Sequence, residues 1–144
     1  MAIWSSPVDL DQLNAYQQDT LVSRLGINYT GVGEDWLAAS MPVDARTKQP
    51  AGILHGGASV ALAETLGSTG ANLCVDRDKT LCVGLEINAN HLHAVRAGEV
   101  RGVARPLHLG GSTQVWEIRI SDHKDRLVCV SRITMAVLDR RNFK

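Results

Sequence analysis

The residues best suited to chemistry lie in one stretch, residues 49–71, which reads QPAGILHGGASVALAETLGSTGA. Backbone N–H groups at a helix start are unpaired and carry the positive end of the helix dipole, so they can receive an oxyanion. Gly56 and Gly57 would let a substrate carbonyl approach that backbone closely. Glu64 can act as a general base on water or attack an acyl carbon. These groups suit thioester hydrolysis, because a thiolate with a pKa of about 8.5 leaves without a strong acid.

One helix cannot bring both parts of this stretch to the same carbonyl. Gly56 and Glu64 are eight residues apart, which is roughly 12 Å along a helix axis. If both take part, the helix start of one subunit must face the helix middle of another. We therefore expect an active site at a two-fold interface and an inactive monomer. Ser68 lies one turn beyond Glu64 on the same face, within reach of the carboxylate or the thioester.

The elements that must position these residues are one long helix and about six strands. A helix is predicted from Gly56 to about Leu73, after an irregular loop at residues 44–54. Alternating residues at 27–43, around a Gly33–Asp35 turn, predict a hairpin. Four further strands are predicted at residues 81–90, 99–107, 114–121 and 127–138. The connections are short enough for antiparallel pairing.

An antiparallel sheet with one helix buries a single face, so these elements predict an α+β hotdog fold, a curved sheet wrapped around the helix. Two short helices at residues 9–16 and 20–25 would form a lid. The chain fits one domain, residues 1–144, with a basic tail at 139–144 that we expect to fray. Alternation predicts that one face of the first long strand carries Leu81, Val83, Leu85, Ile87 and Ala89.

Composition argues against several classes of partner. The formal net charge is zero and 44% of the residues are apolar, so nothing indicates binding to nucleic acid. Apolar runs fall far short of the roughly 20 residues of a membrane helix, and the N-terminus lacks a signal-peptide pattern. Three cysteines without C-x-x-C spacing indicate neither a disulfide framework nor a zinc site. We expect a cytoplasmic protein with no nucleic-acid or membrane partner.

Three segments carry a resemblance to a known family: MPVDARTKQPAGILHGGASVALAETLGSTGA at 41–71, VGLEINANH at 83–91 and RPLHLG at 105–110. They resemble the hotdog thioesterases of the Arthrobacter-type 4-hydroxybenzoyl-CoA subgroup, in particular its branches of bacterial 1,4-dihydroxy-2-naphthoyl-CoA hydrolases and enterobactin-pathway proofreading enzymes. The similarity covers nearly the whole chain. It implies hydrolysis of an acyl-CoA thioester, with an aryl or hydroxyaryl acyl group, by a homodimer or a dimer of dimers (homotetramer). It also implies no cofactor and no metal, since coenzyme A is part of the substrate.

The resemblance implies roles for individual residues. Glu64 would be the nucleophile or general base, the backbone N–H of Gly56 would polarise the thioester, and Ser68 would assist Glu64. Gln49 and His55 would position substrate or water. Coenzyme A contacts are implied at Gly84, His91, Leu92, His93, Ala94, His108, Leu109, Gly110, Gly111, Ser112 and Thr113.

Three positions depart from the family pattern. Ala51 stands where Phe is usual, His93 where Arg is usual, and Gly111 where a polar or basic residue is common. They concern the acyl pocket and the contacts with the coenzyme A phosphates, and none touches the proposed chemistry.

Other interpretations stay open at this point. One is a module that binds acyl-CoA without hydrolysing it, and another is a hotdog hydratase or dehydratase, although no helix-borne Asp–His pair is visible. His91 and His93 would face one way on a strand and could bind a metal, but no third ligand has a recognisable spacing. Gly110–Gly111 fits either a hairpin turn or a phosphate-binding nest.

Overall fold

The strands form one antiparallel sheet in the order β1-β2-β4-β5-β6-β3. The computed structural model describes residues 1–143. The strands are β1 (Asn28–Val32), β2 (Leu37–Pro42), β3 (Thr80–His91), β4 (Glu99–Leu109), β5 (Thr113–Asp122) and β6 (Leu127–Asp139). The helices are α1 (Leu10–Tyr16), α2 (Leu21–Arg24), α3 (Gly56–Leu73) and the 3-10 turn η1 (Arg140–Asn142). The predicted count of six strands and one long helix is confirmed.

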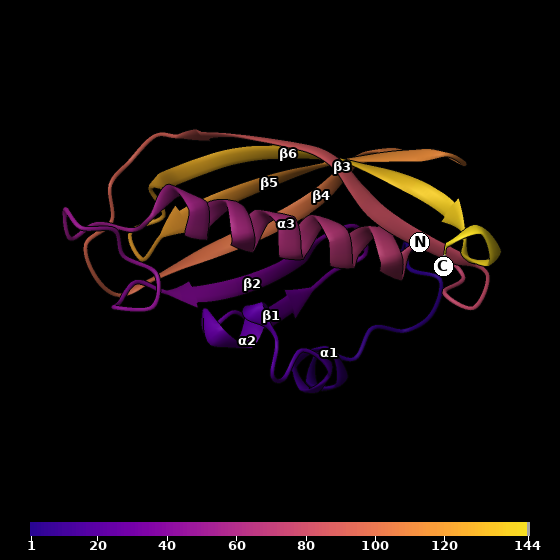
Figure 1. Ribbon diagram of the computed structural model, residues 1–144, viewed down its shortest axis with the longest axis horizontal. Helices are drawn as coiled ribbons and strands as arrows, with labels where there is room; N and C mark the ends of the chain where they lie inside the picture. Colours follow the sequence, from indigo (N-terminus) through magenta and orange to yellow (C-terminus); the bar gives the residue numbers. More distant parts are fainter. Residues whose placement is uncertain (144) are drawn as a thin grey trace.

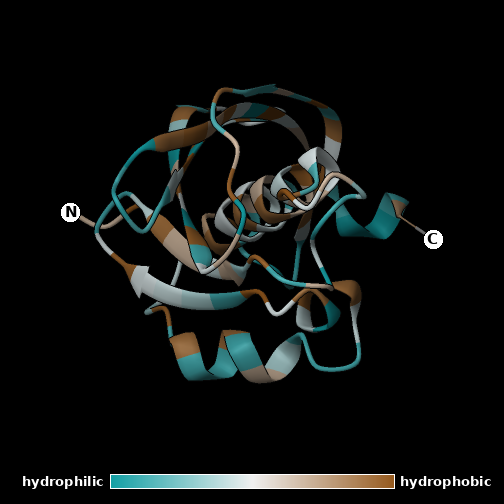
Figure 2. Ribbon diagram, turned by 90° about the vertical axis from the view of Figure 1, so that its left-hand side faces the viewer, coloured by the Kyte–Doolittle hydropathy of each residue, from teal (hydrophilic) through white to brown (hydrophobic). Residues whose placement is uncertain are grey.

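The curved sheet wraps around α3, which runs along its concave face (Figures 1 and 2). Glycines on α3 make this close approach possible. A β-carbon at Gly67 would lie 2.5 Å from Cγ2 of Ile133, and one at Gly70 would lie 2.9 Å from the ring of Trp116. Such separations are too short for a side chain, so the sheet presses on the helix backbone as the small residues predicted. This arrangement is the hotdog fold.

The core lies between α3 and the sheet. Trp116 on β5 is fully buried and its Nε1–H donates to Oε1 of Gln114 at 2.9 Å. Trp4 stacks on it with ring centroids 6.3 Å apart, and the Trp4 Nε1–H donates to the carbonyl of Gly33. The N-terminal segment is therefore fastened across the β1–β2 hairpin, and it leads into α1 and α2 below the sheet (Figure 1).

One prediction about β3 is wrong, because the strand contains a bulge. Gly84 pairs with Met135 and Glu86 with Thr134, which leaves Leu85 without a partner. An extra residue reverses which side chains face the core. Leu85, predicted for the core face, is 63% exposed, whereas Cys82 is buried. Beyond the bulge the prediction holds, since Ile87 and Ala89 pack against the core.

The C-terminal tail is also more ordered than predicted. Residues 140–142 form the turn η1, and the backbone N–H of Arg140 donates to the carbonyl of Lys79 at 2.9 Å. The Nε–H of Arg140 donates to the carbonyl of Arg77 at 2.8 Å. Arg140 thus attaches the tail to the loop that follows α3, and position 144 of the predicted tail lies outside the described residues. Within residues 1–143, no helix has the length and apolar character needed to cross a membrane.

Candidate active site

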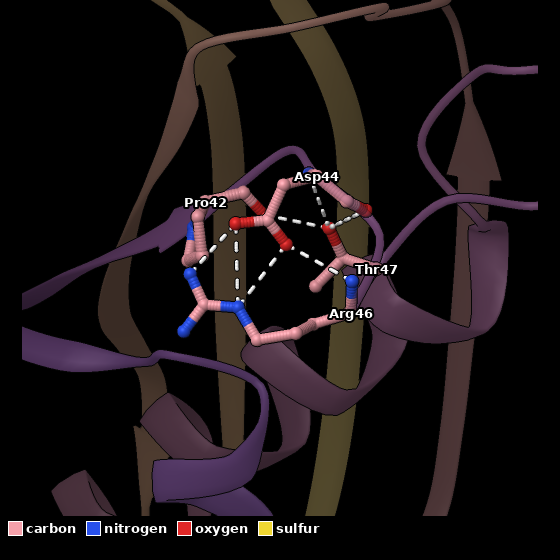
Figure 3. Close-up of polar contacts among 4 residues, drawn as sticks. All are labelled: Pro42, Asp44, Arg46 and Thr47. Carbon is pink, nitrogen blue, oxygen red and sulfur yellow. Dashed lines mark hydrogen bonds and ion pairs between the residues drawn. The ribbon is translucent and has the colours of Figure 1, made fainter.

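The loop between β2 and α3 is held by a compact set of side-chain contacts (Figure 3). Oγ1 of Thr47 donates to the carbonyl of Pro42 at 2.6 Å, and the carboxylate of Asp44 accepts from the Arg46 guanidinium at 2.7 Å. The Arg46 side chain holds the pKa of Asp44 at about 2. The carbonyl of Thr47 in turn accepts from the backbone N–H of His55 at 2.8 Å. This loop therefore determines where α3 begins.

His55 caps α3 and selects one free N–H at the helix start. Its Nδ1 accepts from the N–H of Gly57 at 2.7 Å, so the cap occupies Gly57. No hydrogen bond among residues 1–143 involves the N–H of Gly56. The unpaired donor at the positive end of α3 is therefore the one that sequence reasoning assigned to the oxyanion.

Gln49 is oriented by its own turn. Its Oε1 accepts from the N–H of Ala51 at 2.5 Å, and its backbone N–H donates to the carbonyl of Ile53 at 2.9 Å. With Oε1 occupied, the side-chain N–H groups of Gln49 are left to serve a ligand.

A cavity of about 400 Å³ joins Gln49 and the start of α3 at Gly56, and His55 is not part of its lining. It is lined by Gln49, Gly56 and the segment His91 to Ala94, together with Ile53, Leu54, Ser59 and Val128. The ring of His91 covers Gly56, since a β-carbon there would lie 3.0 Å from Nε2 of His91. We call this space the oxyanion cavity.

Ser59 is a member of the oxyanion cavity that sequence reasoning missed. It is 1% exposed and lines this cavity from α3. The sequence signal that could have identified Ser59 is a polar residue three positions after Gly56, on the buried face of α3.

Glu64 lies in a different and larger cavity, of about 570 Å³, together with Ser68. Burial raises the pKa of the Glu64 carboxyl above its ordinary value. Gly84 on β3 faces the carboxylate, because a β-carbon there would lie 2.8 Å from Oε1 of Glu64. We call this space the acyl cavity, and within one chain it is separate from the oxyanion cavity.

The acyl cavity lies between α3 and the N-terminal helices, which therefore occupy the position of the expected lid. Leu13, Gln17 and Val22 line one side, and the α3 residues Glu64, Thr65, Ser68, Thr69, Asn72 and Leu73 line the other. The hydroxyl groups of Tyr29 and Thr69 lie 2.6 Å apart in a shared hydrogen bond. Neither was among the predicted site residues, although Thr69 follows Ser68 directly and lines the same cavity.

The segments predicted to contact coenzyme A lie at opposite ends of the sheet. His91 pairs with Cys129 of β6, whereas Thr113 pairs with Ala136. Residues 108–113, which comprise His108, Leu109, Gly110, Gly111, Ser112 and Thr113, form the β4–β5 hairpin end, where the Gly110 N–H donates to the carbonyl of Thr113. Gly110 is thus used in a hairpin turn. One chain does not bring the two segments together.

His91 and His93 do not share a strand face, because β3 ends at His91. His91 lies over Gly56, whereas Nε2 of His93 lies 3.8 Å from Oδ2 of Asp122. Burial alone would raise the pKa of Asp122. The backbone N–H groups of Arg126 and Lys124 and the Arg126 side chain, at 2.8 Å, donate to its carboxylate and bring the pKa down to about 2. Among residues 1–143, no three His, Cys, Asp or Glu side chains converge as metal ligands would.

Comparison with known proteins identifies close relatives. A family model described as the thioesterase superfamily matches residues 51–129. The chain is 53% identical over 136 residues to 1,4-dihydroxy-2-naphthoyl-CoA hydrolase from Escherichia coli, covering 94% of this chain and 99% of that one. It is 54% identical to the proofreading thioesterase EntH from Cronobacter turicensis, covering 94% and 98%. A crystal structure of a mutant thioesterase from Pseudomonas aeruginosa has a TM-score of 0.95 at 51% identity, covering 96% and 99%. The resemblance inferred from the sequence is confirmed.

Proposed function

This chain belongs to the thioesterase superfamily and is a thioesterase, and we propose that it hydrolyses aryl- or hydroxyaryl-CoA esters at a site shared between two subunits. The observation that carries the shared site is the separation of the two cavities. The free N–H of Gly56 opens into one and the carboxylate of Glu64 into the other. A second copy, related by a two-fold axis, would place the Gly56 N–H of each subunit next to the Glu64 carboxylate of the other.

The edge strand β3 supports the assembly. It is 12 residues long, it pairs with β6 on one side only, and it exposes Leu85. A long edge strand with unpaired backbone groups and an exposed apolar side chain is a template for pairing with another chain. Pairing two copies of β3 would extend the sheet across the dimer. Assembly of two such dimers and a cytoplasmic location remain predictions that rest on the resemblance and on cysteine usage.

The reaction then follows from the groups at the shared site. Glu64 of one subunit takes a proton from a water, and the resulting hydroxide attacks the thioester carbonyl. The carbonyl oxygen gains charge and accepts from the N–H of Gly56 of the other subunit, with Gln49 as a further donor. When the C–S bond breaks, the thiolate recovers the proton from Glu64 and leaves as coenzyme A. The alternative is attack by Glu64 itself, which forms an anhydride that water then opens.

The acyl cavity supports an acyl group that bears hydroxyls. Tyr29 and Thr69 share a single hydrogen bond, so the pair keeps capacity for a polar substituent. Two relatives carry names that specify a dihydroxynaphthoyl-CoA hydrolase and a proofreading thioesterase. Coenzyme A would lie along His91 to Ala94, with the β4–β5 hairpin supplied by a second subunit.

A complementation experiment tests the shared site. Gly56→Pro removes the backbone N–H at the first helical position, where proline is tolerated, and His55 already has the extended conformation that proline requires before it (φ −68°, ψ 130°). Glu64→Gln removes the carboxylate. Each variant alone should be inactive with benzoyl-CoA. After unfolding and refolding together, statistical mixing should restore about a quarter of wild-type activity, because one of the two sites in each heterodimer is intact.

Gly56→Ala is the matched control, since it adds the same β-carbon beside His91 but keeps the N–H. It should retain far more activity than Gly56→Pro. Complementation that fails although mixed dimers are detected by native mass spectrometry would contradict the shared site.

A further inference from the structure

The acyl cavity changes chemical character along its length. Glu64, Thr65 and Ser68 line it from the middle of α3, and its apolar lining residues include Leu13, Val22, Leu73 and Leu81. Arg77 and Arg140 line it as well, beyond the C-terminal end of α3 at Leu73. Glu64 is the only acidic residue of this lining. The cavity therefore combines a carboxylate, an apolar section and two guanidinium groups.

The two arginines are held at this position by contacts with the protein. The Nε–H of Arg140 donates to the carbonyl of Arg77 at 2.8 Å, and the backbone of Arg140 is attached to Lys79. The guanidinium of Arg77 lies 5.8 Å from the ring centroid of Tyr16 on α1, a cation–π arrangement. The guanidinium groups thus belong to the rim where the lid, the loop after α3 and the C-terminal turn meet.

Neither arginine is neutralised within residues 1–143. Arg46, Arg105 and Arg126 each have a carboxylate within 4 Å, at 2.7, 2.8 and 2.8 Å respectively. No such ion pair is formed by Arg77 or Arg140 in that part of the chain. Asp78 lines the outer recess beside them, but it lies outside the acyl cavity. Positive charge at this rim is therefore available to a ligand.

We propose that Arg77 and Arg140 bind an anionic group, such as a carboxylate, at the far end of the acyl chain of the substrate. The inference rests on the proposed function, because it assumes that the acyl group enters from the Glu64 side. The nine steps from Glu64 to Leu73 span roughly 13 Å along α3, and arginine side chains reach back over part of this length. An acyl group that carries a carboxylate at its far end fits this distance, and a planar guanidinium suits a carboxylate.

A pair of probes that differ only at the far end tests the proposal. Octanoyl-CoA and suberyl-CoA have the same chain length, and suberyl-CoA ends in a carboxylate. Thiol release should give a suberyl-to-octanoyl ratio of kcat/KM that falls about tenfold in the double variant Arg77→Gln/Arg140→Gln, as expected for loss of charge-assisted hydrogen bonds. Arg140→Lys should retain part of the ratio. Arg141→Gln, which breaks an exposed pair with Asp139, is the matched control and should leave it unchanged.

Binding provides a readout independent of turnover. Calorimetry with the Glu64→Gln protein should show weaker suberyl-CoA binding, but unchanged octanoyl-CoA binding, when Arg77→Gln and Arg140→Gln are added. Equal weakening of both ligands would mean that the arginines bind coenzyme A phosphates, and it would overturn the proposal. An unchanged suberyl-to-octanoyl ratio would also overturn it. Hydrolysis of benzoyl-CoA by the wild-type protein separates such a failure from a failure of the proposed function.

Discussion

Gly84 on β3 lies so close to Glu64 on α3 that a β-carbon at position 84 would be 2.8 Å from Oε1 of the carboxylate. Apart from the atoms of Glu64, the nearest atom to that β-carbon is Cδ1 of Ile133, at 3.8 Å. The glycine therefore leaves room for the carboxylate in particular. The expected role of Gly84 as a coenzyme A contact stays a prediction, but its position makes it a determinant of where Glu64 points.

Gly84→Ala should lower kcat/KM by more than tenfold with little change in stability. The added methyl group meets the end of a flexible side chain, so the carboxylate moves and the backbone does not. Gly31→Ala is the control, because its β-carbon would be similarly crowded, 3.0 Å from the ring of Trp36, but far from Glu64. Thiol release would measure kcat/KM of both variants, and thermal unfolding would measure their stability. Equal activity of the two variants would contradict this account.

Glu64→Gln should abolish turnover and yet raise the melting temperature at pH 7. Burial raises the pKa of Glu64 in the folded state, so the folded protein binds this proton more tightly than the unfolded chain does. The carboxyl therefore favours folding below the unfolded pKa of about 4.3 and loses that contribution as pH rises through the folded pKa. The neutral amide avoids this loss. The stability difference should disappear below about pH 4. A variant less stable than wild type at pH 7 would contradict the claim that the ionised Glu64 carboxylate destabilises the folded protein.

The acid limb of the pH profile should reflect the same group. Because the reaction needs ionised Glu64, kcat/KM should fall as pH drops through a value above the ordinary pKa of glutamate. Thiol release measured from pH 4 to 8 would locate the limb. The stability of the fold should persist to lower pH, since Asp44 and Asp122, with pKa values of about 2, keep their hydrogen-bonded carboxylates until pH falls toward 2. A limb at or below pH 4 would exclude Glu64 as the titrating group.

His55→Ala should destabilise the protein by about 1 kcal/mol, through loss of the helix cap. His55→Asn should restore most of this stability, because its side-chain oxygen can accept from the N–H of Gly57 in place of Nδ1. Chemical denaturation of the three proteins gives the comparison. If the two variants were equally unstable, the hydrogen bond to Gly57 would not be the relevant contact. Lower activity in the stable Asn variant would assign His55 a further part in catalysis.

Leu85→Glu should shift the protein from dimer to monomer and remove activity. The change places a charge on the edge strand that we propose pairs with a second copy. Leu21→Glu on α2 is the matched control, since Leu21 is 64% exposed against 63% for Leu85 and lines neither cavity. Light scattering coupled to size exclusion would measure the mass of each. A dimeric, active Leu85→Glu protein would place the interface elsewhere.

The sequence by itself determined the elements and the chemical groups. The period of the apolar residues and the positions of the turns located the strands to within one or two residues, as with the predicted 114–121 against the observed Thr113–Asp122. The small residues of α3 indicated how closely the sheet would approach. These features are local, so they can be read from neighbouring residues in the chain.

Only the tertiary structure decided how those elements meet. The bulge at Leu85 depends on how β3 pairs with β6, so alternation alone assigned Leu85 to the wrong face. Arg77 and Arg140 are far apart in the sequence, and the fold brings them together at the rim of the acyl cavity. Each of these results from contacts between segments distant in sequence, which local periodicity does not record.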